Sequence, residues 1–231
     1  MKEKDKNVYL IISGQRHGTD TLCRKFEDLP DSISLYEAFN EDAGGRHGAF
    51  AKFLPTSVFS EQDSSALMPF LRDICNIFFP DKETISLKIL PTDCRGPQSN
   101  VREIKDSFRK GIDFFSCFSR LKTEPWESQI NIKYILLHRN LEDCYRSYIR
   151  AYTTGDWTND RSKGRSEYTS DYLVDVNDLE SFELYNQRHV NWFNEWEVFL
   201  KNKNLRYQHL MFDELISKHF NLKSFLHNEW L

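Results

Sequence analysis

Short apolar runs alternate with amphipathic stretches along the whole chain. The clearest run, INIKYILL at 130–137, is rich in β-branched residues and predicts a buried strand. A second run at 8–12 leads directly into a turn with glycine and predicts a strand that ends there. Weaker runs predict further strands at 33–36, 84–90 and 205–210.

Helices are predicted where apolar residues recur every three or four positions. This spacing occurs in six segments, which are 20–28, 67–78, 101–122, 141–152, 179–201 and 212–231, the last with a break near Asn221. Strands therefore alternate with helices, an order typical of a parallel sheet covered by helices on both faces. We expect an α/β protein in which residues 1–231 form one three-layer domain with a central, mainly parallel sheet.

Two long polar segments, 38–60 and 153–177, contain glycines and no clear periodicity, and we expect surface loops there. Loops of this length in a compact domain are often functional lids. Both carry basic residues, which are Arg46, His47, Lys52, Arg161, Lys163 and Arg165. The basic residues of the second loop either face solvent or close over the cofactor or an anionic acceptor.

The turn after the first strand has the sequence GQRHGTDT, residues 14–21. In a strand–turn–helix unit the turn's N–H groups and the helix N-terminus face one point, which suits an anion. Gly14 and Gly18 permit positive φ and close backbone approach, and Arg16 adds a fixed positive charge. We interpret this turn as a phosphate-type loop. The alternative is an ordinary strand-to-helix connection. The missing lysine argues against a Walker A loop.

Other charged residues follow predicted strands directly, and ligands of parallel sheets bind beyond the carboxyl ends of the strands. Glu37 follows the second strand, and Arg139 follows the strand at 130–137 closely. Ser147 lies about two helical turns after Arg139, so both side chains are placed to reach one phosphate. The sequence thus predicts two anion sites at one edge of the sheet.

Composition narrows the class of protein. The net charge of −4 and the pI near 6.0 argue against a dedicated nucleic-acid surface. The five cysteines include no C-x-x-C pair and lack the spacing of zinc ligands, so we expect a reducing, cytoplasmic environment and no metal. No run of eighteen apolar residues occurs, and we expect no membrane span.

Two motifs in this order resemble the PAPS-dependent sulfotransferases, and especially the bacterial carbohydrate sulfotransferases of the trehalose, lipopolysaccharide and Nod-factor type. The first is R-x-G-T…L-C-R, from Arg16 to Arg24. The second is R-N-x-x-D-x-x-x-S…A-x-x-T-G-x-W, from Arg139 to Trp157. The helix containing NWF, the strand LRYQHL and the terminal helix also follow the family's layout. The resemblance spans residues 8 to about 228 and fits a P-loop-like version of the three-layer fold.

The resemblance implies transfer of a sulfuryl group from PAPS (3′-phosphoadenosine 5′-phosphosulfate) to a hydroxyl of a carbohydrate or glycolipid. The 5′-phosphosulfate would be held by the first loop, which comprises Gly14, Gln15, Arg16, His17, Gly18, Thr19, Asp20 and Thr21. Arg139 and Ser147 would hold the 3′-phosphate. Because a sulfuryl group carries less charge than a terminal phosphoryl group, the reaction requires no metal. The trehalose-type relatives suggest a homodimer.

The resemblance also assigns a base. Glu37, in LYEAF, occupies the place of the glutamate that is the proposed base in the trehalose-type enzymes. His17 is a rival base; otherwise it packs against the nucleotide or faces solvent. Lys88 either extends toward the phosphosulfate or is an ordinary lysine at the sheet edge.

The chain departs from the family's pattern at Asp20, where relatives usually carry a small hydroxyl residue. A carboxylate near a phosphosulfate is repulsive unless it turns outward. Two alternative functions therefore stay open. One is a degenerate nucleotide-binding module without catalysis, and the other is a P-loop small-molecule kinase.

Overall fold

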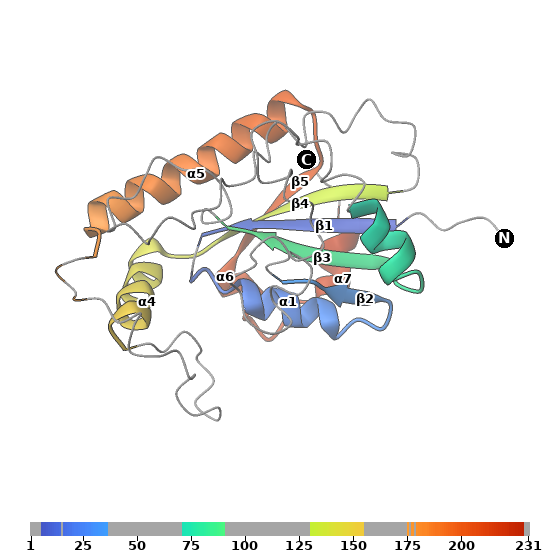
Figure 1. Ribbon diagram of the computed structural model, residues 1–231, viewed down its shortest axis with the longest axis horizontal. Coiled ribbons are helices and arrows are strands. Elements are labelled where there is room, and N and C mark those ends of the chain that lie inside the picture. The colour runs from blue at the N-terminus through green and yellow to red at the C-terminus, as the bar shows by residue number, and fades with distance from the viewer. Residues whose placement is uncertain are drawn as a thin grey trace.

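Figure 1 shows a computed structural model of the chain, which describes residues 6–14, 16–36, 71–90, 130–154, 175, 177 and 179–228. Its strands are β1 (Lys6–Ser13), β2 (Ser32–Ser34), β3 (Thr84–Ile89), β4 (Ile130–His138) and β5 (Tyr207–Met211). They form one sheet in the order β2-β3-β1-β4-β5, and every neighbouring pair is parallel. The predicted α/β class is confirmed; its P-loop-like character stays a prediction.

The helical segments are α1 (Thr19–Glu27), η4 (Ile74–Phe78), α4 (Leu141–Thr154), α5 (Phe182–Asn202), α6 (Phe212–Leu215) and α7 (Leu222–His227). Alternate residues of β1 point to opposite faces of the sheet. Val8, Leu10 and Ile12 pack with α5 and residues 71–75, whereas Tyr9 and Ile11 pack with α1, α6 and α7. Helices therefore cover both faces, giving the three layers visible in Figure 1.

Two predicted helices differ from the observed ones, and one predicted break is confirmed. The described part of the helix predicted at 67–78 ends in the π-helical segment η4, where the Phe79 N–H donates to the Ile74 carbonyl. Helix α5 begins later than predicted because Ser181 caps it, accepting from the Leu184 N–H at 3.3 Å. The break near Asn221 is confirmed, since Asn221 caps α7.

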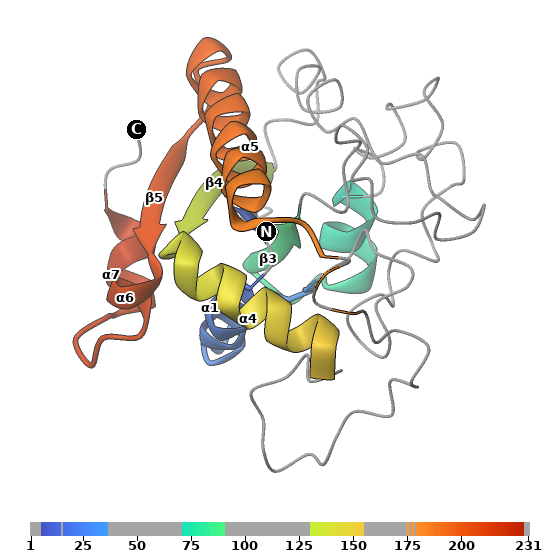
Figure 2. The same ribbon diagram turned by 90° about the vertical axis from the view of Figure 1, so that its left-hand side faces the viewer.

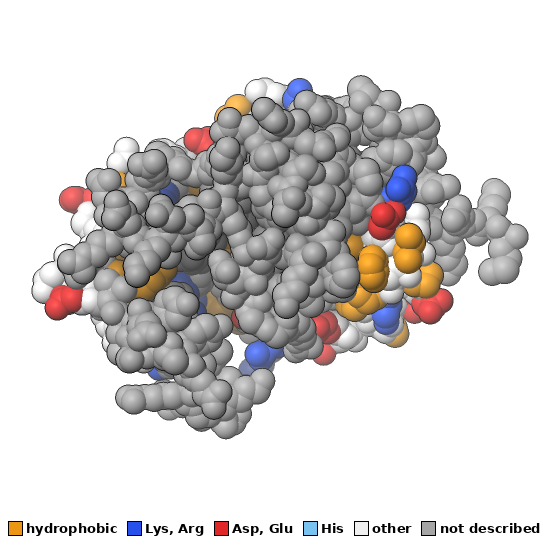
Figure 3. Space-filling view, in the orientation of Figure 1, with side chains coloured by type: hydrophobic (Ala, Val, Ile, Leu, Met, Phe, Trp, Pro, Cys, Tyr) orange, Lys and Arg blue, Asp and Glu red, His pale blue; other side chains and the backbone are white. Residues whose placement is uncertain are grey.

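The amino end of β1 is tied to the end of η4 by Lys6. Its ammonium donates to the carbonyls of Cys75, Phe79 and Pro80 at 2.6–2.8 Å. Figure 3 shows hydrophobic side chains on the surface over this segment, where Ile77 is 68% exposed.

Several predicted segments lie outside the described residues: the loop at 38–60, the helix at 101–122 and most of the loop at 153–177. Among the described helices, none combines the length and hydrophobicity needed to cross a bilayer.

We predict that Trp196→Ala destabilises the fold by about 3–5 kcal/mol, because Trp196 is fully buried between α5 and the sheet. Val198→Ala, two residues along α5 and 57% exposed, is the matched control and should change stability by less than about 0.5 kcal/mol. Urea unfolding followed by circular dichroism measures both. Equal effects of the two substitutions would contradict the assigned packing of α5.

Candidate functional site

The candidate site lies at the carboxyl edge of the sheet, where β1 and β4 end side by side. The chain leaves β1 through α1 toward β2 at one edge of the sheet, and it leaves β4 through α4 and α5 toward β5 at the other. Adjacent parallel strands whose connections part in this way form a switch point, the usual position of a ligand. Figure 2 looks toward this edge, with α1 and α4 in view.

The backbone between β1 and α1 turns through two left-handed residues. Arg16 has φ 67° and Gly18 has φ 86°. Gly18 is the N-cap of α1 and supplies no side chain to its first turn, whose N–H groups point out of the helix. A Cβ at Gly18 would lie 2.2 Å from the ring of Phe212, so the glycine permits both the φ value and this contact. Such a turn makes a concave, anion-binding arrangement of N–H groups.

Arg16 joins this loop to the mid-chain cluster. Its Nε donates to Ser147 Oγ at 2.9 Å, and its carbonyl accepts from Arg139 Nη1 at 3.0 Å. The Arg139 guanidinium also lies over the ring of Phe212, 4.5 Å from the centroid. The glycine turn and the arginine–serine pair predicted from the sequence are therefore brought together at one place.

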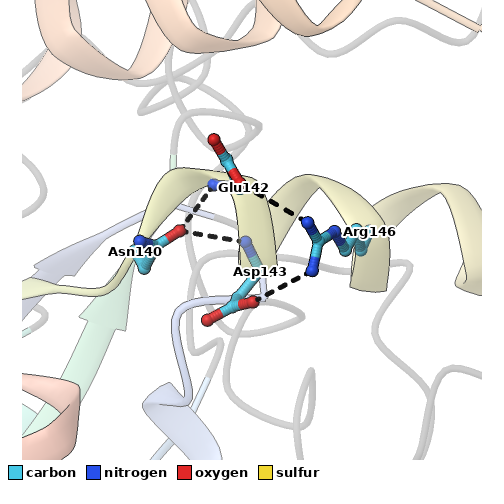
Figure 4. A network of polar contacts seen from close by, with 4 residues as sticks. All are labelled: Asn140, Glu142, Asp143 and Arg146. Carbon is cyan, nitrogen blue, oxygen red and sulfur yellow. Dashed lines mark hydrogen bonds and ion pairs between the residues drawn. The ribbon is translucent and has the colours of Figure 1, made fainter.

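The N-terminus of α4 lies beside this cluster, but two N–H groups of its first turn already have a hydrogen-bond acceptor within the chain (Figure 4). Asn140 Oδ1 accepts from the N–H groups of Glu142 and Asp143 at 2.9 and 3.2 Å. Both carboxylates of this turn pair with Arg146, at 3.5 and 3.9 Å. An external anion is therefore favoured at α1 rather than at α4.

Asp20 and Lys88 form an ion pair next to the first loop. Lys88 Nζ, on β3, lies 2.6 Å from Asp20 Oδ1 in the first turn of α1. The Lys88 side chain is only 4% exposed, whereas that of Asp20 is 55% exposed. Asp20 is thus turned partly toward solvent, and its charge is balanced by a buried ammonium.

His17 is buried, and the expectation that it faces solvent is wrong. Its ring stacks on His189 of α5, with the centroids 5.4 Å apart and the planes 9° from parallel. Each ring directs Nδ1 at a backbone carbonyl, that of Leu137 for His17 and that of Tyr185 for His189. A carbonyl only accepts, so Nδ1 carries the proton in both rings.

The Nε2 atoms of these two histidines therefore carry lone pairs, and neither has a hydrogen-bond partner among the residues that the structure describes. Both lie within 2.6 Å of the point where a Cβ would stand on Gly14. Gly14 is thus required by the close approach of His17 and His189 rather than by a turn. Burial lowers the pKa of His17 to about 3 and that of His189 to about 4, and the proximity of His189 further lowers the pKa of His17.

Two further histidines, on β4 and β5, lie beside α5. His138, at the end of β4, packs on Phe193 and contacts His209 of β5 through their ring nitrogens at 2.8 Å. His209 in turn lies 3.8 Å from Glu197. Burial and the neighbouring His209 lower the pKa of His138 to about 4. His17, His189 and His138 are therefore neutral imidazoles on this side of the site, whereas cations lie on the side of Arg16 and Arg139.

Two predicted site residues, Gln15 and Glu37, lie outside the described residues, as do the basic residues of the two long loops. Tyr36, which precedes Glu37, is described. Its carbonyl accepts from the Lys88 N–H at 2.9 Å, and its hydroxyl donates to Glu27 at 2.9 Å. Of the remaining loop residues, Thr19 is buried and Thr21 half-buried.

Two residues at the site, His189 and Phe212, were not predicted from the sequence as site residues. The signal for His189 in the sequence is a histidine within the aromatic stripe of the predicted helix at 179–201. Phe212 carried no signal, because nothing local indicates that a residue after β5 packs on Gly18 and Arg139.

Within the described residues, no group of three or more histidine, cysteine or acidic side chains is arranged to hold a metal ion. No protein-family model matches the chain, and no curated protein matches it significantly. The resemblance to sulfotransferases therefore stays a prediction.

We predict that the protein loses stability as the pH falls from 6.5 toward 3. Between these values the unfolded chain protonates at His17, whose ordinary pKa is 6.5, while the folded chain resists protonation there. His17→Asn keeps a donor for the Leu137 carbonyl but does not titrate, so its stability should depend less on pH.

The matched control is His219→Asn at an exposed histidine, which should leave the profile unchanged. Urea unfolding at a series of pH values measures all three proteins. Parallel profiles for the wild type and His17→Asn would contradict the buried, neutral state of His17.

Proposed function

We propose that this chain is a PAPS-dependent sulfotransferase that transfers a sulfuryl group to a hydroxyl of a carbohydrate or glycolipid. The observation that carries the proposal is the contact of the Gly14–Thr19 turn with Arg139 and Ser147, through Arg16. A donor with phosphate groups at both the 3′ and 5′ positions needs two anion sites separated by no more than a nucleoside. One contiguous cluster with a loop and an arginine–serine pair meets that requirement.

The charges at this edge fit such a donor. Arg16, Lys88 and Arg139 supply three cationic side chains beside the N-terminus of α1, and Asp20 is balanced by Lys88. Positive groups held in place before the reaction stabilise charge that develops on the departing phosphate oxygens. Bound in this cluster, PAPS would supply the activated sulfuryl group, and the protein would supply position and charge.

A kinase is less well supported by the same residues. The loop between β1 and α1 lacks the lysine that reaches the β- and γ-phosphates in Walker A proteins. Its cations come instead from Arg16 within the loop, from Lys88 of β3 and from Arg139 directly after β4. A sulfuryl group carries less charge than a phosphoryl group, so its transfer does not depend on the Walker lysine.

We assign the base to Glu37 rather than to His17. The burial of His17 and the direction of its lone pair toward Gly14 leave it no path to an acceptor hydroxyl. Glu37 follows Tyr36, whose backbone is tied to β3 beside Lys88. Glu37 is therefore the residue next in the chain to Tyr36, which is hydrogen-bonded to β3 at the carboxyl edge of the sheet. As the hydroxyl oxygen attacks sulfur, its proton passes to this carboxylate. The bond from sulfur to the 5′-phosphate oxygen breaks, and PAP leaves with the electron pair of that bond.

We predict that PAP, the product nucleotide, raises the melting temperature of the protein and that ATP with Mg²⁺ does not. Arg139→Met and Ser147→Ala should weaken PAP binding, the former by about tenfold to a hundredfold, because each removes a donor to the 3′-phosphate. Arg146→Met is the matched control on the exposed face of α4, and it should bind PAP as the wild type does. Stabilisation by ATP–Mg²⁺ alone would contradict the proposal in favour of a kinase.

We predict that Glu37→Gln lowers sulfate transfer by about 10²–10⁴-fold and leaves PAP affinity unchanged, because a general base acts on the acceptor and not on the nucleotide. Mass spectrometry of a glycan library incubated with PAPS measures the products. Glu195→Gln, at an exposed position of α5, should be fully active. Transfer by Glu37→Gln at the wild-type rate would remove Glu37 as the base, and PAP binding without transfer to any glycan would favour a non-catalytic module.

A further inference from the structure

The Asp20–Lys88 pair has its charges distributed unequally between core and solvent. The ammonium is almost fully buried beneath α1, and the carboxylate that balances it is more than half exposed. A buried charge depends strongly on its partner, because removing that partner leaves the charge desolvated. The exposed member is the one that solvent and ligands can reach.

The position of the ammonium increases this dependence. Lys88 Nζ lies against the first turn of α1, where the helix dipole is positive, as is the ammonium itself. Two like charges at one place require an anion close by. Among the described residues, the carboxylate of Asp20, two positions after Gly18, supplies such an anion.

We propose that the Asp20 carboxylate competes with the bound nucleotide for Lys88. Asp20 pairs with Lys88 in the ligand-free protein, and the 5′-anion of the donor replaces Asp20 when the nucleotide binds. This inference rests on the proposed function. When the nucleotide binds, Lys88 Nζ exchanges the Asp20 carboxylate for an oxygen of the ligand, and Asp20 turns into solvent. The exchange weakens nucleotide binding by the strength of the broken ion pair. It thereby sets the affinity for the donor and favours release of the product, PAP.

The exchange predicts opposite effects on stability and on affinity. Asp20→Asn removes the carboxylate, so the ligand-free variant should melt at a lower temperature than the wild type. The same variant should bind PAP about tenfold or more tightly, because Lys88 is no longer held by Asp20. At saturating PAP the difference in melting temperature should close. Titration calorimetry with PAP, together with thermal unfolding with and without PAP, measures these quantities.

Two further variants separate the exchange from a general loss of negative charge. Asp28→Asn removes one carboxylate at the exposed carboxyl end of the same helix, and it should leave PAP affinity unchanged. In the Lys88→Met background, Asp20→Asn should no longer tighten binding appreciably, since the ammonium for which they compete is gone. The double variant also has no buried ammonium and should fold without ligand.

The outcomes decide between the two proposals. Failure of the wild type to bind PAP overturns the proposed function and this inference with it. If the wild type binds PAP but Asp20→Asn binds it equally or more weakly, the inference is overturned and the proposed function stands. The same holds if Asp20→Asn tightens binding as much in the Lys88→Met background. If Asp20→Asn does not fold alone, restoration of its unfolding transition by PAP supports the exchange, and failure of PAP to restore it overturns the exchange.

Discussion

The hydrogen bond from Arg139 to the carbonyl of Arg16 is the contact on which the candidate site depends. It ties the end of β4 to the turn after β1, at the point of the sheet where the two connections part. Arg16 completes the tie by donating to Ser147 of α4. The sheet supplies the rigidity behind these contacts, because β1 is hydrogen-bonded on both sides and covered on both faces. Positions at this edge are therefore set by the core rather than by the loop alone.

Ionisable side chains are buried on both sides of the loop, charged on one side and neutral on the other. On the side of β3, a buried lysine stays compatible with the fold through the carboxylate of Asp20. On the side of α5, His17 and His189 are compatible with burial because they are neutral, with lowered pKa values. The loop thus has the Asp20–Lys88 ion pair on one side, where we infer that an external anion replaces Asp20. On its other side, the neutral rings of His17 and His189 pack closely against Gly14.

The sequence predicted the parts of the molecule that depend on local pattern. Apolar runs predicted the five described strands, helical periodicity predicted the described helices around them, and the rule for parallel sheets placed the turn at 14–19 and Arg139 at one edge. Pairing between distant residues had no such signal. Lys88 and Asp20 are 68 positions apart, and their contact requires the register of β3 on β1. The stacking of His17 on His189 likewise depends on the packing of α5, and the contact of Lys6 with Cys75 on the packing of η4 beside β1.

A crystal structure of the protein with PAP would show where both phosphates bind. We expect the 5′-phosphate over the turn between Gly14 and Thr19, with the 3′-phosphate within hydrogen-bonding distance of Arg139 and Ser147. A nucleotide bound at another part of the molecule, or bound with its 3′-phosphate away from both residues, would contradict this expectation.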